Sequence, residues 1–168
     1  MKKYIIIALL FIMAHLAKAQ EQVSLAFLQD VKLATIGDKD HGYDAFTLNV
    51  IARVKMQGNQ QKHGFLIVYP EVEYADLKQS YLRYSANAGY TFNQLFINNF
   101  EASLFGGFGF INRDGEGSSS LSLTGELGYR LSNRFKIVMD GQMVQRSDIQ
   151  KNIFSGFLGV EFKIFNYE

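Results

Sequence analysis

The sequence of 168 residues contains no cysteine, no tryptophan and a single proline, Pro70. Without cysteine no disulfide can form, so hydrogen bonds and packing alone have to hold the fold. Pro70 lacks an amide hydrogen, which predicts a bulge or a kink where it lies in a strand. After the first twenty residues the sequence also lacks an apolar run of the roughly 20 residues that a transmembrane helix requires. A helical membrane span is therefore excluded from this part of the sequence.

The N-terminus has the three parts of a secretory signal peptide. Lys2 and Lys3 supply a positive charge, an apolar region follows, and Ala17-Lys18-Ala19 is a small-x-small cleavage site. An uncleaved membrane anchor is the alternative, but the apolar region is shorter than the roughly 20 residues of a spanning helix. We therefore expect residues 1–19 to be removed and residues 20–168 to form a single domain.

The charges of the mature chain are nearly balanced. Removal of the signal lowers the number of basic residues from 17 to 14, against 16 acidic residues. A net charge of about −2 does not provide the basic surface that binds a phosphate backbone. Nucleic acid is therefore excluded as a partner.

Beyond the signal, apolar and polar residues alternate in segments that are separated by clusters of Gly, Asn, Asp and Ser, a pattern typical of strands and hairpins. An up-and-down series of such segments predicts an all-β fold, an eight-stranded antiparallel transmembrane β-barrel. The expected strands are Gln22–Thr35, Ala45–Met56, Gly64–Ala75, Tyr81–Phe92, Asn99–Ile111, Leu121–Leu131, Phe135–Val144 and Ile153–Phe165.

The alternation divides these strands into two faces of opposite character. One face carries no charge and is rich in large apolar residues, as Leu158, Val160 and Phe162 illustrate in the last strand. The other face carries seven acids and seven bases, with small or uncharged residues between them. Its charged residues are Asp30, Lys32, Arg53, Lys55, Glu71, Glu73, Arg83, Glu101, Glu126, Arg130, Lys136, Asp140, Glu161 and Lys163.

The width of the barrel decides which face lies inside. An eight-stranded barrel is just wide enough for side chains to fill, and the large apolar set would not fit there. We therefore expect the apolar face to contact lipid and the charged face to form a salt-bridged plug, because an unpaired buried charge costs several kcal/mol. Arg83 or Arg130 is expected to pair with Glu101 or Glu126.

Strand length and aromatic placement agree with a barrel that spans a membrane. Strands of about ten to twelve residues, tilted by about 45°, cover the hydrocarbon layer, and aromatic residues gather near the strand ends. In this pattern the chain resembles the small eight-stranded outer-membrane barrels, a group that includes OmpX and the transmembrane domain of OmpA. The resemblance implies an outer-membrane location in a Gram-negative bacterium, contact with lipid and lipopolysaccharide, and insertion by the barrel assembly machinery.

The charged interior indicates a structural or surface-interaction role without catalysis. The polar connections Gly37–Asp44 and Asn112–Ser120 are expected to be loops that could contact a surface ligand. The aspartates of Gly37–Asp44 could also bind a divalent ion weakly. His41 and His63 lie in connections with no serine one to three residues away, so no catalytic site, cofactor or resident metal is expected.

Three alternatives remain open for the function. They are a secreted soluble β-barrel that carries a hydrophobic ligand, a narrow channel, and a lipid-modifying barrel enzyme. The soluble carrier would need the apolar face inside the barrel, the channel would need more lumen than eight strands supply, and the enzyme would depend on His41.

Overall fold

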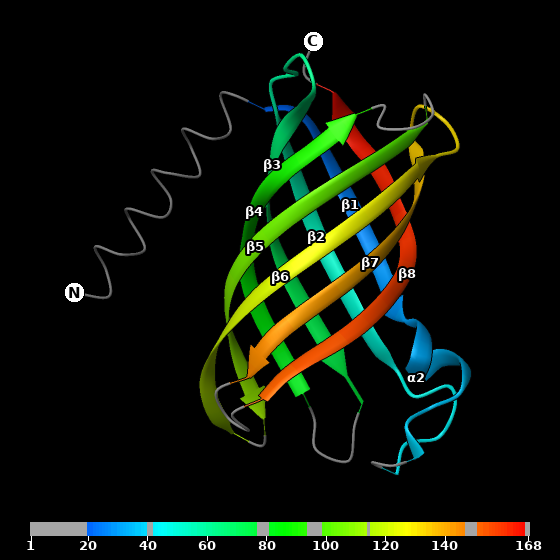
Figure 1. Ribbon diagram of the computed structural model, residues 1–168, viewed down its shortest axis with the longest axis vertical. Coiled ribbons are helices and arrows are strands. Elements are labelled where there is room, and N and C mark those ends of the chain that lie inside the picture. The colour runs from blue at the N-terminus through cyan, green and yellow to red at the C-terminus, as the bar shows by residue number, and fades with distance from the viewer. Residues whose placement is uncertain are drawn as a thin grey trace, which may run out of the picture.

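The computed structural model describes residues 20–39, 42–76, 81–93, 99–113, 115–146 and 151–166. These residues form one closed antiparallel barrel (Figure 1). Its strands are β1 (Gln20–Asp30), β2 (Asn49–Gly58), β3 (Gly64–Ala75), β4 (Tyr81–Asn93), β5 (Phe100–Arg113), β6 (Glu116–Arg130), β7 (Phe135–Arg146) and β8 (Lys151–Asn166), and a short helix, α2 (Val31–Thr35), follows β1. In this described part of the chain, no helix is long and apolar enough to cross a membrane. The predicted all-β, eight-stranded antiparallel architecture is confirmed.

Closure of the barrel depends on the pairing of the first strand with the last. Each strand pairs with its neighbours in the sequence, and β1 also pairs with β8, from Gln22 opposite Asn166 to Asp30 opposite Phe157. Because the number of strands is even, β1 starts and β8 ends at the same end of the barrel, at the top of Figure 1. We call this the terminal end, and we call the opposite end, where α2 lies, the α2 end.

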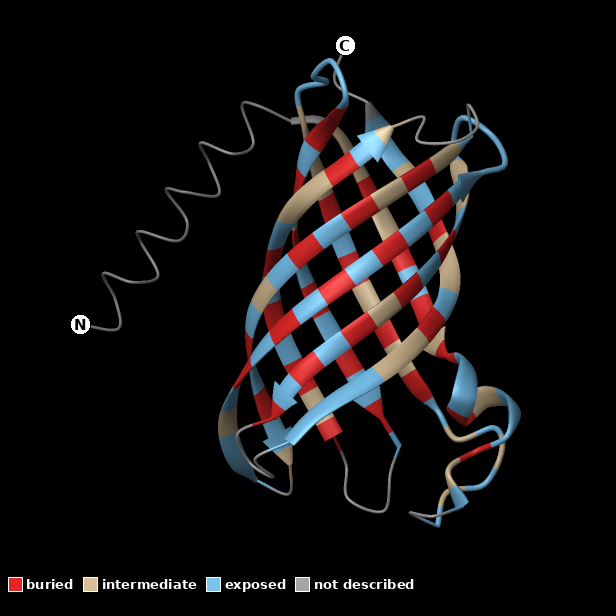
Figure 2. Ribbon diagram, viewed as in Figure 1, coloured by how far each residue is buried: buried red, intermediate tan, exposed pale blue. Residues whose placement is uncertain are grey.

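Side chains alternate between the lumen and the outer surface along the strands, as the banded colouring of Figure 2 shows. Every strand exposes at least one large apolar side chain on the outer surface. Examples in strand order are Phe27, Val54, Leu66, Tyr84, Leu104, Leu121, Met139 and Leu158, which are between 39% and 56% exposed. A continuous apolar surface of this extent is unfavourable in water and matches the lipid-facing band of a membrane barrel.

Aromatic side chains gather in two belts on this outer surface. Toward the terminal end, the ring centroids of three pairs, Tyr90–Phe92, Phe100–Tyr129 and Phe135–Phe162, are 4.9, 5.0 and 4.9 Å apart. Toward the α2 end, the rings of Phe108 and Phe110 on β5 are 5.2 Å apart, and Tyr74 on β3 and Phe154 on β8 are also exposed. Aromatic rings favour the boundary between lipid and water, so the two belts mark the borders of the membrane-spanning band.

The first strand ends at Asp30 rather than at Thr35, because Asp30 begins a helix. Its Oδ1 accepts a hydrogen bond from the amide of Leu33 at 2.8 Å, which is the arrangement of a helix N-cap. Val31–Thr35 then forms a short helix with Leu33 buried. The prediction of a strand through these residues was wrong. The second strand was also predicted to begin too early, at Ala45, and begins at Asn49.

Within the polar segment Asn112–Ser120, which was expected to be a loop, the described residues 112–113 and 116–120 belong to strands. β5 continues to Arg113 and β6 begins at Glu116, and these two residues lie opposite each other in the ladder. Gly115 has a φ of +86°, a conformation that glycine adopts without the strain of a side chain. The loop prediction was wrong because this part of β6 contains serines and glycines and few apolar residues, so its sequence lacks the alternation that indicates a strand.

Pro70 lies where the pairing of β3 with β2 is interrupted, but the register of the two strands does not shift there. The pairing of β2 with β3 lapses between Arg53–Glu71 and Met56–Val68, and the register is the same on both sides of the gap. Toward β4 the ladder is continuous through Pro70. The predicted bulge is therefore absent, since the missing amide hydrogen affects one neighbouring strand only.

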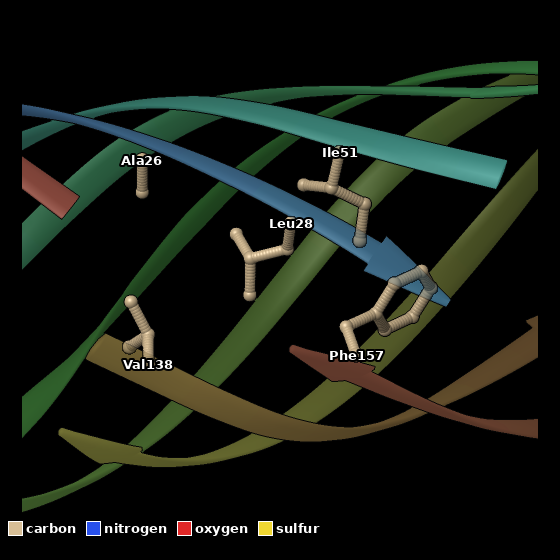
Figure 3. Packing of buried hydrophobic residues seen from close by; sticks show 5 residues of the cluster. All are labelled: Ala26, Leu28, Ile51, Val138 and Phe157. Carbon is tan, nitrogen blue, oxygen red and sulfur yellow. The ribbon is translucent and has the colours of Figure 1, made fainter. Parts of the chain in front are cut away.

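The lumen also contains apolar residues that the division into two faces did not predict. One cluster comes from β1, β2, β7 and β8, and its side chains point toward one another where the barrel closes (Figure 3). Its members, Ala26, Leu28, Ile51, Val138 and Phe157, are at most 3% exposed. The junction of the first and last strands is thus packed from the inside as well as hydrogen-bonded.

Glycines on the inner face make room for the side chains that cross the lumen. A Cβ atom on Gly107 would lie 1.9 Å from Oδ1 of Asn87 and 2.5 Å from Oγ of Ser122. By contrast, a Cβ atom on Gly106, the neighbouring outward position, would have no atom within 4 Å. The two glycines therefore offer a direct test of which face is full.

We expect Gly107→Val to lower the free energy of unfolding by about 1–3 kcal/mol, because the new side chain overpacks the lumen. Gly106→Val, its matched control, should change that free energy by no more than about 0.5 kcal/mol. Urea unfolding in lipid vesicles, followed by tyrosine fluorescence, measures both values. An equal effect of the two substitutions would contradict the assignment of Gly107 to a packed interior.

Candidate functional site: the charged lumen

The inner face of the barrel holds a series of acidic and basic side chains. Strands supply them because inward positions recur at every second residue. The members are Arg53 and Lys55 on β2, Glu71 and Glu73 on β3, Arg83 on β4, Glu101 on β5, Glu126 and Arg130 on β6, Lys136 and Asp140 on β7, and Glu161 and Lys163 on β8. All of these are among the residues that the sequence predicts for the lumen.

At the terminal end, ion pairs link five strands, β2, β5, β6, β7 and β8. Glu101 binds Arg130 and lies 3.1 Å from Nζ of Lys136. Lys136 also lies 3.1 Å from Glu161, and Glu161 is 2.8 Å from Nζ of Lys55. Each of the two carboxylates is therefore shared by two cations.

In the middle of the lumen, Arg53 is the centre of the network. Its Nε lies 2.6 Å from Glu71, and its Nη1 binds Asp140 and lies 3.4 Å from Glu126. Glu126 is also 2.6 Å from Nζ of Lys55, which joins this group to the ion pairs of the terminal end. Arg53 thus holds three carboxylates that come from three different strands.

Toward the α2 end, Arg83 continues the network. Its Nη1 lies 2.8 Å from Glu71 and 4.0 Å from Glu73. Its other nitrogen atoms donate hydrogen bonds to the hydroxyl groups of Ser120 at 3.0 Å and Ser122 at 2.8 Å. Arg83 therefore contacts β3 on one side and β6 on the other, across the lumen from each other.

Arg146 belongs to the inner face but is missing from the predicted set. It is 7% exposed, and its guanidinium carbon lies 4.9 Å from the ring centroid of Tyr81. Tyr81 in turn donates a hydrogen bond to Glu73 at 3.3 Å. The sequence signal was present, since the alternation of β7 continued two residues past Val144 places Arg146 inside.

Lys32 does not face the lumen, and its assignment to the charged interior was wrong. It lies in α2, where 57% of its side chain is exposed, and its Nζ is 3.0 Å from Asp38. Asp30 points inward at the end of β1, but its carboxylate caps α2. Both results have one cause, because the strand that would have placed these residues in the lumen ends at Asp30.

The predicted ion-pair partners are partly those observed. Arg130 binds Glu101 as expected, whereas Arg83 binds Glu71. The partner of Arg83 therefore lies on β3, the neighbour of β4 on the side opposite to β5. Other long side chains reach across the lumen. Lys55 on β2, for instance, contacts Glu126 on β6.

The central part of the network is removed from solvent. The side chains of Arg53, Arg83 and Glu71 are 0% exposed, and that of Lys55 is 1% exposed. Buried ions of this kind are tolerated when they are paired, and each of these four has an ion-pair partner. Nη2 of Arg53 nevertheless has no hydrogen-bond partner. The carboxylates are held by cations, so the arrangement fixes neighbouring and opposite strands rather than presenting a reactive group.

Among the residues that the structure describes, no group of three or more His, Cys, Asp or Glu side chains is arranged to hold a metal ion. The loop suggested as a weak divalent-ion site is described only in part, since Asp40 and His41 lie outside the described residues. Within its described part, the backbones of Asp38 and Tyr43 exchange two hydrogen bonds of 2.9 Å.

Solved structures with a similar fold are transmembrane barrels. The outer membrane protein Ail of Yersinia pestis in phospholipid bilayer nanodiscs is 12% identical, with a TM-score of 0.57 over 86% of this chain and 100% of Ail. The crystal structure of Ail, the attachment invasion locus protein, is 13% identical, with a TM-score of 0.51 over 85% and 97%. A de novo designed transmembrane β-barrel is 11% identical, with a TM-score of 0.54 over 86% and 97%.

No protein-family model matches the chain, and no curated protein matches it in sequence. The likeness to the three solved structures therefore concerns the fold. It confirms the expected resemblance in architecture to the small eight-stranded outer-membrane barrels.

Arg53→Met should lower the free energy of unfolding by about 3–5 kcal/mol, because it leaves buried carboxylates without their cation. Arg130→Met is the matched control at the rim, where 49% of the arginine side chain is exposed. Solvent screens that pair, so we expect a loss of no more than about 1 kcal/mol. Urea unfolding in lipid vesicles measures both, and a loss at Arg53 no larger than at Arg130 would contradict the central role of Arg53.

Proposed function

We propose that the protein is an integral barrel of the bacterial outer membrane with a structural or surface-interaction role. Residues 1–19 direct its export and are cleaved, the barrel assembly machinery inserts it, and lipid and lipopolysaccharide surround it. The apolar outer surface and the two aromatic belts support this location. The terminal end then faces the periplasm and the α2 end faces the outside, as expected for an exported chain with both termini on the same side.

The observation that carries the proposed role is the complete burial of the central ion pairs. An aqueous pore would leave Arg53, Arg83 and Glu71 in contact with water, and their side chains are 0% exposed. The network therefore acts as a plug that is part of the folded barrel. A solute could pass only if several buried ion pairs separated, each at a cost of several kcal/mol.

A role at the cell surface is supported by the segment between β1 and β2. Its described residues are held by the cap of α2, the ion pair between Lys32 and Asp38 and the bridge between Asp38 and Tyr43. It nevertheless presents Ile36 at 65% exposure and Phe46 at 90% exposure. Phe46 has a φ of +68°, a conformation unusual for a bulky residue, and such strain is found at binding sites. The structurally similar Ail is named the attachment invasion locus protein.

Of the two remaining alternatives, the soluble carrier fits the structure less well, whereas His41, on which the enzyme depends, lies outside the described residues. A soluble carrier needs an apolar lumen that holds its ligand, whereas most large apolar side chains lie outside and the lumen is filled by ion pairs and packed apolar clusters. A lipid-modifying enzyme needs a histidine beside a nucleophile or an acid. His63 lies in the turn between β2 and β3, where its carbonyl oxygen accepts a hydrogen bond from the amide of Asn93 at 3.2 Å.

The refolded barrel is expected to insert into planar lipid bilayers without producing conductance steps, because the buried ion pairs block the lumen. Current recordings at increasing voltage test this expectation, with a general porin as the positive control for insertion and detection. Regular conductance steps from the purified wild-type protein would show that the lumen is an open channel and would contradict the plug.

The absence of cysteine allows each end of the barrel to be labelled separately. Lys39 lies near α2 and Lys62 lies in the turn between β2 and β3, and both are exposed. A membrane-impermeant maleimide should label Lys39→Cys on intact cells, whereas Lys62→Cys should react only after the outer membrane is permeabilised. Labelling of Lys62→Cys alone on intact cells would show the opposite orientation. Labelling of neither variant on intact cells would contradict the exposure of the α2 end at the cell surface.

A further inference from the structure

The terminal end of the lumen opens into a small pocket. It has a volume of about 40 Å³ and lies between β1, β2, β3, the start of β5, the turn from β6 to β7, and β8. A cavity of roughly 10–15 Å³ holds one water molecule, so this pocket has room for a group of only a few heavy atoms. A single oxyanion fits such a space, whereas a sugar or a lipid chain does not.

The charges that line this pocket are strongly unequal. Five cations and two carboxylates face it, namely Lys55, Arg130, Arg134, Lys136 and Lys163 against Glu101 and Glu161. Lys55 is also held by Glu126, which lies deeper in the lumen and removes part of the excess. The ion-pair network is therefore balanced in the middle of the barrel but leaves a surplus of positive charge at this mouth.

Two of these cations take no part in the network. Among the described residues, neither Arg134 nor Lys163 has a carboxylate within 4.0 Å. Their backbones are nevertheless joined, because the amide of Lys163 donates a hydrogen bond to the carbonyl oxygen of Arg134 at 2.9 Å. The turn that carries Arg134 is itself ordered by Ser132, whose hydroxyl oxygen accepts hydrogen bonds from the amides of Arg134 at 3.3 Å and Phe135 at 3.1 Å.

Lys136 contributes a third cationic group whose position is fixed. Its side chain passes over Gly128, where an added Cβ atom would lie 2.9 Å from its Cδ. Its Nζ is held at 3.1 Å from both Glu101 and Glu161. An anion that enters the pocket therefore meets one ordered ammonium group and, at the rim, two cations that have no carboxylate of the described residues within 4.0 Å.

We propose that this mouth is a binding site for a single phosphate-type oxyanion, with Arg134 and Lys163 as its principal contacts. Arginine suits this role because its planar guanidinium group donates two parallel hydrogen bonds to a phosphate. Under the proposed orientation the site lies at the periplasmic border of the membrane. Both free phosphate and the phosphate group of an anionic phospholipid are available in that location.

The test is isothermal titration calorimetry of the refolded barrel in a non-ionic glucoside detergent, which contains no phosphate of its own. One series adds inorganic phosphate, and a second adds phosphatidylglycerol dispersed in the same micelles, so that the two sources are distinguished. The test variant combines Arg134→Gln with Lys163→Gln. The control combines Lys39→Gln with Lys62→Gln, which removes the same charge from exposed positions outside the pocket.

The proposal expects saturable binding of at least one phosphate source to the wild type. It also expects this binding to weaken about tenfold or more in the test variant and to be unchanged in the control, because two charge-assisted contacts are lost. The gel mobility shift between unboiled and boiled samples shows that both variants are folded. Absence of saturable binding to either source, or an equal loss in the two variants, would overturn the site. Neither result affects the plugged lumen, which depends on the deeper ion pairs.

Discussion

A chain that crosses lipid has to satisfy every backbone amide and carbonyl within the protein, because hydrocarbon offers no hydrogen-bond partner. Here the constraint is met by antiparallel ladders that close through β1 and β8. Closure with eight strands produces a narrow lumen and a much larger outer surface. Because side chains alternate along a strand, every second residue points into the lumen and the others point outward. The bulky apolar side chains therefore face lipid, and the inside receives charged residues with glycine and serine between them.

The narrow interior then imposes a requirement of its own. Charged side chains without access to water have to be paired, and Arg53 shows how fully this is done, with carboxylates from β3, β6 and β7 around one guanidinium group. Apolar clusters such as the one at the junction of β1 and β8 fill the space beside the ions. Where the barrel meets water at the terminal end, strict pairing is no longer needed. In the part of the chain that the structure describes, Arg134 and Lys163 have no carboxylate within 4.0 Å, which makes that mouth different from the fully paired centre.

Much of this arrangement could be predicted from the sequence, because alternation and barrel width together determine which residues point inward. The bounds predicted for β3 are those observed, and Arg53, Lys55 and Glu71 lie in the lumen as expected. Errors arose where a local interaction overrides the alternation. Asp30 ends its strand by capping a helix, which moves Lys32 outside. The partner of Arg83 could not be predicted either, since the choice between the carboxylates of β3 and β5 depends on strand register. The contact of Lys55 with Glu126 across the lumen also depends on strand tilt, and the alternation of residues specifies neither.

The central claim is that the apolar face is outside and the barrel is stable only when lipid or detergent covers it. Heat-modifiability of the chain without residues 1–19 tests this claim most directly. The protein is refolded in detergent and run unboiled and boiled on a denaturing gel, with circular dichroism recorded with and without detergent. The structure predicts a mobility shift and a β-type spectrum only in detergent. A chain that folds in plain buffer and shows no shift would contradict the claim, because its apolar face would then have to lie inside.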